Sequence, residues 1–315
     1  MVGVEKYHGT GNDFIIIDAA ENVPDRRALA ADLCDRETGL THPDASTTGA
    51  DGILFLALED EYSPPRVVMT LVQPDGSVAA MCGNGARCAA KWVSERTGSD
   101  VVMIDTQSGT RRAEIGEQGV TIEMGAPTFE PEGVPLARDE PLIQETVEGL
   151  PVTALNTGVP HAVAFVDDVT TIHIDEVAPP VRHADVFPEG ANVTFAAPRP
   201  DGGPASRGEG DQDGRSPSVR GFDQRTFERG VEGETDSCGT GAVAIVAAAE
   251  RLGKVERGER VPVHPPGGRL VVELTDDDAL LHGPVEREFA GQVALSGSER
   301  VDTDADADAD ATGDD

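Results

Sequence analysis

The chain is organised around the stretch Met81-Cys82-Gly83-Asn84-Gly85-Ala86-Arg87-Cys88. It places a cysteine before a small, glycine-rich turn, and the alanine-rich run that follows predicts a helix. The stretch Ser237-Cys238-Gly239-Thr240-Gly241-Ala242 repeats this plan far downstream. We therefore expect Cys82 and Cys238 at or just before helix N-termini. There, unpaired backbone N–H groups and the positive end of the helix dipole stabilise a thiolate or a bound anion.

The regions that precede the two cysteine motifs also share one pattern. Strands predicted at 2–7 and 14–18 enclose the polar turn 8–13, and strands predicted at 152–155 and 162–166 enclose the polar turn 156–161. In both regions an aspartate stands at the end of the second, apolar run, namely Asp18 and Asp167. The chain is therefore predicted to be a duplication in which each half contributes one cysteine-headed helix.

The remaining pattern predicts further elements and a domain division. We expect a helix at 24–36 and strands at 53–58, 66–72, 101–105, 110–115, 120–124, 193–196, 219–227, 261–263, 269–274 and 285–289. The expected domains are 1–126 together with about 284–296, and 127–283 with an inserted loop at 199–218. Residues 297–315 are expected to form a disordered acidic tail. Its alternating aspartates are not a calcium loop, because glycine at 307 and glutamate at 313 would be needed and are missing.

Composition narrows the class of protein. The 315 residues suffice for two domains, no run of 18 apolar residues occurs, and the N-terminus lacks a secretory signal, so a cytoplasmic protein is expected. The 58 acidic and 25 basic residues give a net charge of −33, which disfavours nucleic acid and anionic membranes as partners. An acidic partner-binding protein and a halophilic protein would both have this charge. We favour the halophilic interpretation, since concentrated salt screens self-repulsion.

The four cysteines do not have the spacing of a metal site. Cys34, Cys82, Cys88 and Cys238 form no Cys-x-x-Cys pair and have no nearby histidine pair, so zinc is not expected. A disulfide is not expected in a reducing cytoplasm. Cys34 and Cys88 are predicted to be buried as small apolar side chains. Without a metal motif, a pyridoxal phosphate (PLP) lysine or a nucleotide loop, no cofactor is predicted.

Two thiols at two helix N-termini suit one kind of reaction. A carbon that carries a carboxylate and an ammonium group holds its proton very weakly acidic. Its inversion needs a base on one face, an acid on the other, and donors for the developing charge. A thiolate and a thiol supply the first two, and the backbone N–H groups of Gly83, Asn84, Gly239 and Thr240 could supply the third.

Four segments taken together resemble the diaminopimelate epimerases. They are His8-Gly9-Thr10-Gly11-Asn12-Asp13-Phe14, 81–88, Phe227-Glu228-Arg229-Gly230 and Glu234-Thr235-Asp236-Ser237-Cys238-Gly239-Thr240-Gly241-Ala242. The resemblance implies an α+β fold of two pseudo-symmetric domains, each a β-rich sheet or barrel wrapped around a central helix. It also implies a PLP-independent two-base isomerase that interconverts LL- and meso-diaminopimelate in lysine biosynthesis.

The same resemblance assigns roles to individual residues. Cys82 and Cys238 match the acid–base pair, and His161 and Glu228 match groups that modulate their pKa values. The positions matching substrate contacts are Asn12, Gln73, Gly83, Asn84, Asn192, Glu228, Arg229, Gly239 and Thr240. Three positions depart from the family pattern: Gln73 and Val159 stand where asparagine is frequent, and Gly52 stands where some members carry glutamine.

Two alternatives stay open at this point. A proline or hydroxyproline racemase of the same fold would also use two cysteines, but it would be expected to have histidine in place of Asn84. A binding protein with a thiol redox switch could use Cys82 and Cys238 as its switch pair. The partner expected of the enzyme is a small amino acid. A homodimer is compatible with the sequence.

Overall fold

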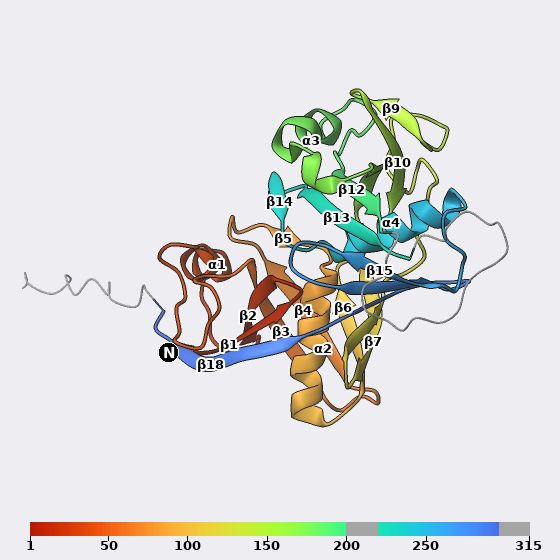
Figure 1. Cartoon of the computed structure of the whole chain (residues 1–315). Coiled ribbons are helices and arrows are strands. Elements are labelled where there is room, and N and C mark those ends of the chain that lie inside the picture. The colour runs from red at the N-terminus through yellow and green to blue at the C-terminus, as the bar shows by residue number, and fades with distance from the viewer. Residues whose placement is uncertain (200–219, 296–315) are drawn as a thin grey trace, which may run out of the picture.

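The computed structural model describes residues 1–199 and 220–295, and its elements follow one another twice in the same order (Figure 1). The first half runs β1(Val2–Gly9), β2(Asn12–Asp18), α1(Arg26–Cys34), β3(Gly52–Glu59), β4(Arg66–Val72), β5(Val78–Ala79), α2(Gly83–Thr97), β6(Val101–Thr106), β7(Gly109–Gly116) and β8(Gly119–Glu123). After β9(Glu145–Val147), the second half runs β10(Leu150–Asn156), β11(Pro160–Phe165), the short 3-10 helix η1(Val169–Thr171), α3(Ile174–Arg182), β12(Asn192–Pro198), β13(Phe222–Glu228), β14(Gly233–Thr235), α4(Gly239–Arg251), β15(Arg260–His264), β16(Leu270–Leu274) and β17(Ala279–Gly283). The last described element is β18(Glu286–Val293).

The strand pairings of the two halves are the same. In the first half β1–β2 is antiparallel, β2–β3 parallel, β3–β4 antiparallel and β4–β6 parallel. In the second half β10–β11, β11–β12, β12–β13 and β13–β15 repeat these directions in order. The meanders β6–β7–β8 and β15–β16–β17 also match. The predicted duplication is therefore confirmed by the sheet topology.

Two pairings join the halves. Strand β8 pairs antiparallel with β17, its own counterpart in the duplication. Strand β18 returns from the second half and pairs with β1 of the first (Figure 1). On these pairings we propose the domain division 1–126 with 284–296, and 127–283.

Each half wraps its sheet around one helix. Helix α4 is buried at every residue from Gly239 to Ala249, as expected of a helix that is apolar all round and enclosed by a sheet. Helices α2 and α4 share a single apolar core with the inner faces of the strands. Separate cores on the outer faces include residues of α1 in the first half and of α3 in the second. The predicted α+β class and the central helices are confirmed.

Some local predictions need correction. The helix predicted at 24–36 is shorter and runs Arg26–Cys34, because Asp25 caps it by accepting from the backbone N–H groups of Arg27 and Ala28. The last strand, predicted at 285–289, continues to Val293 along β1. Helix α3 and strand β17 were not predicted. Apart from Arg199, the predicted insertion and the predicted tail lie outside the described residues.

Candidate active site

Both motif cysteines are helix N-caps, as predicted. Cys82 and Cys238 have extended backbone angles immediately before α2 and α4. The Cys82 Sγ accepts a hydrogen bond from the Gly85 N–H at 3.4 Å. Cys82 is half-buried, whereas Cys238 is 6% exposed. Each sulfur therefore lies at the positive end of a helix dipole.

The N-termini of the two helices lie against each other. A Cβ atom built on Gly239 would be 3.6 Å from the Gly83 Cα and 2.9 Å from the Leu281 Cδ2. A Cβ on Gly83 would meet the same leucine at 3.0 Å. Because real Cβ atoms rarely come so close to other atoms, a larger residue at either first helical position would require Leu281 to move. The two rows of free N–H groups consequently face one region.

Asn84 connects the two halves at this junction. Its Nδ2 donates to the Asn12 Oδ1 at 3.0 Å and to the Ser237 carbonyl at 3.3 Å, and its Oδ1 accepts from the Arg87 Nη2 at 2.8 Å. Only 1% of Asn84 is exposed. The side chain is therefore engaged within the protein, and the backbone N–H is the part of Asn84 that can face a ligand.

A charged cluster fixes the orientation of the Asn12 side chain, which pairs with Asn84. The Asn12 Nδ2 donates to Asp51, which also accepts from Arg36. Arg36 additionally bonds Asp13 at 2.8 Å, and the fully buried Lys6 bonds the same Asp13 at 2.8 Å. Since Asp51 can only accept from Asn12, the Asn12 oxygen must face Asn84.

Glu228 controls the charge beside Cys238. It ends β13, and its Oε1 accepts from the Thr235 hydroxyl at 2.6 Å. Burial raises the pKa of Glu228. Burial, followed by the Glu228 charge, holds the pKa of Cys238 well above its usual range, and burial raises the pKa of Cys82 to about 11. Both thiols are consequently disfavoured as thiolates until a positive charge or a hydrogen-bond donor compensates.

His161 reaches Cys238 through a hydroxyl group. The Nε2 of this fully buried histidine is 3.0 Å from the Thr240 Oγ1, which is 3.4 Å from the Cys238 Sγ. Burial lowers the pKa of His161 to about 3, so the imidazole is neutral near pH 7. Asn192 lies next to it, with its Oδ1 accepting from the Arg229 N–H at 2.7 Å.

Comparison with known proteins identifies this arrangement. The family model described as diaminopimelate epimerase matches residues 4–130 and 153–288. The chain belongs to the diaminopimelate epimerase family. It is 39% identical over 300 residues to the diaminopimelate epimerase of Methanocella arvoryzae, covering 91% of this chain and 95% of that protein. It is 33% identical over 311 residues to that of Neisseria meningitidis, covering 92% and 98%.

Solved structures share the fold at lower identity. A predicted epimerase from Pseudomonas aeruginosa has a TM-score of 0.62 and 16% identity, covering 94% of this chain and all of that one. A hydroxyproline epimerase from Agrobacterium vitis has a TM-score of 0.62 and 18% identity, covering 93% and 91%. These likenesses concern the fold alone.

The remaining predicted site residues of this family member are less closely connected to the two cysteines. Arg229 donates its Nη1 to the carbonyls of Glu189 and Gly190 at 3.2 and 3.4 Å. Gln73 occupies the turn after β4, where its Oε1 accepts from the Ser77 hydroxyl at 2.9 Å. In the duplication Gln73 corresponds to Glu228, since each follows or ends the equivalent strand. Val159 immediately precedes β11, and its counterpart in the first half, Asn12, is the first residue of β2.

Gly52, the third departure from the family pattern, has a steric reason. A Cβ at this position would lie 2.6 Å from the Leu71 Cδ1. A glutamine could therefore not stand here unless Leu71 moved. The polar group of this corner is instead the neighbouring Asp51, which was not among the site residues predicted from the sequence.

Sequence analysis also missed buried polar residues of the second half. Thr194, Thr226 and Gln224 form hydrogen bonds behind His161. They sit on strands as inward-facing residues among apolar ones. A register comparison of the two halves would have found them, because their counterparts in the first half are apolar.

Cys34 and Cys88 are buried as predicted, and all four cysteines are unpaired. Within residues 1–199 and 220–295, no group of three or more His, Cys, Asp or Glu side chains could hold a metal ion. No helix in the same part of the chain is long and apolar enough to cross a membrane.

Proposed function

We propose that this protein interconverts LL- and meso-diaminopimelate without a cofactor, using Cys82 and Cys238 as the acid–base pair. The observation that carries the proposal is the contact between two cysteine-capped helix N-termini. The names of the relatives, which are diaminopimelate epimerases across most of the chain, support this substrate. The place of the reaction would be lysine biosynthesis.

The proton balance follows from two thiols on opposite faces of one carbon. One cysteine, as the thiolate, takes the proton from Cα and becomes a thiol. The other, as the thiol, delivers its proton to the opposite face and becomes a thiolate. The configuration is inverted and the total number of protons on the pair is unchanged. The reverse reaction uses the same two groups with exchanged roles.

The helix ends supply the charge stabilisation. The backbone N–H groups of Gly83, Asn84, Gly239 and Thr240 lie in the first turns of the two helices, where they have no partner within the helix. A substrate carboxylate between them would be held more strongly as negative charge develops on it, and this difference lowers the barrier. The substrate ammonium group would at the same time favour thiolate formation, which burial and Glu228 oppose in the empty site.

Hydrogen exchange tests the substrate and the reaction together. The protein is incubated with LL-diaminopimelate in D₂O, with proline as the comparison substrate, and deuterium at Cα is followed. We expect deuterium in diaminopimelate and none in proline. Exchange with proline alone would replace this proposal by the proline or hydroxyproline racemase alternative. Exchange with neither would favour the redox-switch alternative.

The surface charge supports a proposal about the working environment. We take the net charge of −33 as an adaptation to a cytoplasm of high salt concentration, where charges are screened over about 3 Å at 1 M. A homodimer is the assembly we propose to test by light scattering in molar KCl.

A further inference from the structure

A chain of buried polar groups continues inward from His161. The His161 Nδ1 is 3.0 Å from the Thr194 Oγ1, which is 3.3 Å from the Thr226 Oγ1. The Gln224 Nε2 is 3.1 Å from the Thr226 Oγ1 and 3.0 Å from the Cys238 carbonyl oxygen. All four side chains are at most 2% exposed. The chain therefore begins and ends at Cys238.

One atom determines the direction of these hydrogen bonds. The Cys238 carbonyl can only accept, so the Gln224 atom beside it is the NH₂ group, and Thr226 accepts from that group. The Thr226 hydroxyl is then free to donate to Thr194, and the Thr194 hydroxyl to the His161 Nδ1.

A histidine that accepts at Nδ1 and is neutral carries its proton on Nε2. This N–H donates to the Thr240 Oγ1, and the Thr240 hydroxyl hydrogen points to the Cys238 Sγ. Every link thus donates toward the sulfur. A thiolate is a better acceptor than a thiol, so the chain favours the thiolate of Cys238.

The first half has no such chain. When the strand registers of the two halves are matched, Thr194 corresponds to Leu54, Thr226 to Leu71 and Gln224 to Met69. The counterpart of His161 is Phe14. These four residues belong to the apolar core. Cys82 therefore lies against apolar side chains, and among the described residues only backbone N–H groups donate to its Sγ.

We propose that Thr194, Thr226 and Gln224 are positioning residues which make the thiolate of the second cysteine the acceptor of a one-way hydrogen-bond chain. The chain distinguishes two otherwise equivalent cysteines, because at Cys238 alone it counteracts the effect of burial and Glu228 on thiolate formation. This rests on the proposed function, in which one cysteine must start as a thiolate.

One contact opposes this direction. The Asn192 Nδ2 faces the His161 Nε2 at 3.4 Å, because its Oδ1 accepts from Arg229. If Asn192 donated there, the proton of His161 would sit on Nδ1 and the chain would run inward. The Thr240 oxygen is closer, at 3.0 Å. The charged groups around this corner are Glu228 on β13 and Arg229 after it, and Asp51 before β3 acts on Glu228.

The tautomer of His161 decides between these directions. It is read from ¹⁵N-labelled histidine by NMR on the full chain, with the signal assigned by its loss in His161→Gln. We expect the Nε2–H tautomer in the unchanged protein and loss of that preference in Thr226→Val, which removes the hydroxyl but not the volume. Thr226→Ser should restore it. An Nδ1–H tautomer in the unchanged protein would overturn the proposal.

Iodoacetamide alkylation provides a second test of the proposal. The pH midpoint of the reaction is measured separately for each cysteine by peptide mapping. Thr226→Val leaves the Thr240 hydroxyl in place but no longer fixes its direction through Thr194 and His161. It should raise the midpoint of Cys238 by up to about one pH unit, which corresponds to one hydrogen bond to a charged group, and leave Cys82 unchanged. The matched control is Thr153→Val, which removes another buried hydroxyl of the second half. An equal shift in both variants would also overturn the proposal. Neither measurement needs substrate, so a failed diaminopimelate exchange would remain a separate result.

Discussion

Cys82 and Cys238 occupy the same place in two halves of one fold, yet each has a task that the other cannot take over. Inversion needs a group on each face of the carbon, so one thiol alone cannot complete it. We expect Cys82→Ser and Cys238→Ser each to lower the epimerisation rate by at least about 10³-fold, since a serine hydroxyl is a far poorer base. Turnover is followed by conversion of LL- to meso-diaminopimelate.

The matched control for these variants is Cys34→Ala, which removes a buried thiol of the outer core and should leave turnover unchanged. Retained turnover in either serine variant would contradict the two-base assignment. A redox-switch protein would instead keep its function in both serine variants.

His161 should make the stability of the fold depend on pH. Its pKa is about 3 in the folded protein and about 6.5 in an unfolded chain, so below pH 6.5 only the unfolded state takes up the proton. Stability therefore falls as pH falls from 6.5 towards 3. His161→Gln should make this fall less steep by about 1.4 kcal/mol per pH unit. Denaturant unfolding at several pH values measures it, with the exposed His173→Gln as the control expected to change nothing.

We expect Asp51 to be needed for full activity, although it has no role in the proposed chemical steps. It receives the Asn12 amide and thereby turns the Asn12 oxygen toward Asn84. In Asp51→Asn the new amide can donate as well as accept, so the orientation of Asn12 is no longer determined. We expect kcat/KM to fall about tenfold or more, as misplacement near a reacting centre usually causes. The exposed Asp60→Asn should behave like the unchanged protein, and an unaffected Asp51→Asn would show that Asn12 needs no such partner.

At the scale of elements, sequence patterns predicted the helices and strands whose formation depends on neighbouring residues. The glycine-rich turns after Cys82 and Cys238 predicted both central helices, and alternating apolar residues predicted most strands. Helix α3 was hidden by Pro179 and Pro180, and it forms because Ile174, Ala178 and Val181 are buried against the sheet. Pairing across the halves, such as β8 with β17, depends on contacts that no local pattern contains.

The close approach of α2 and α4 predicts that one methyl group is enough to disturb the site. In Gly239→Ala the new Cβ would meet the Leu281 Cδ2 at 2.9 Å, so Leu281 or the first turn of α4 must move. We expect kcat/KM to fall by about 10²-fold. Gly98→Ala is the matched control: Gly98 ends α2 with a φ of 72° and has open space around it. It should cost about 1 kcal/mol of stability and leave turnover unchanged. Equal loss of activity in both variants would remove the steric argument.

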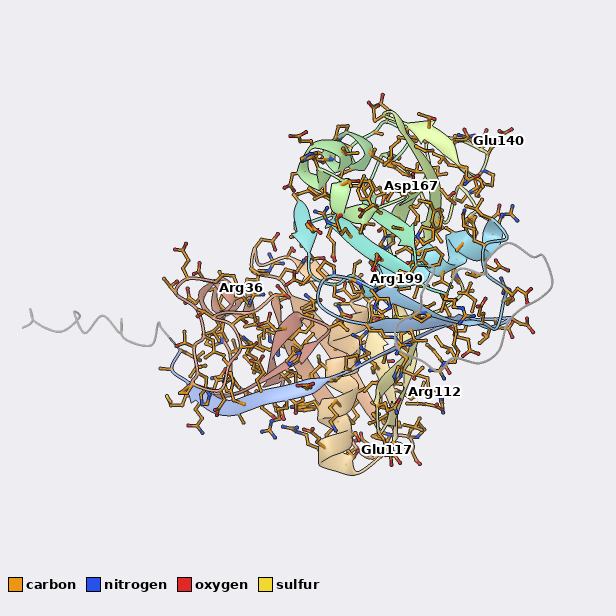
Figure 2. All side chains as sticks on the ribbon, in the orientation of Figure 1. Arg36, Arg112, Glu117, Glu140, Asp167 and Arg199 are labelled. Atoms are coloured by element: carbon orange, nitrogen blue, oxygen red, sulfur yellow. The ribbon has the colours of Figure 1, made fainter. Side chains whose placement is uncertain are left out.

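At the scale of the whole molecule, the acidic residues surround both halves of the duplication. Glu117 lies at one end of the molecule and Glu140 at the other (Figure 2). Repulsion among them opposes the compact state, because the net charge is −33. Salt should therefore stabilise this fold without any change in its contacts.

We expect the thermal unfolding midpoint to rise by about 5 °C or more between 0.1 and 2 M KCl, followed by circular dichroism. If screening is the cause, neutralising exposed acidic residues should raise stability at low salt and flatten the salt dependence. Suitable residues are exposed, lie on both halves and form no ion pair with any residue of 1–199 or 220–295, namely Asp32, Glu61, Glu132 and Asp139. Their replacement by Asn or Gln is compared with the unchanged protein at each salt concentration. Greatest stability at low salt would show that the acidic surface serves a partner rather than the solvent.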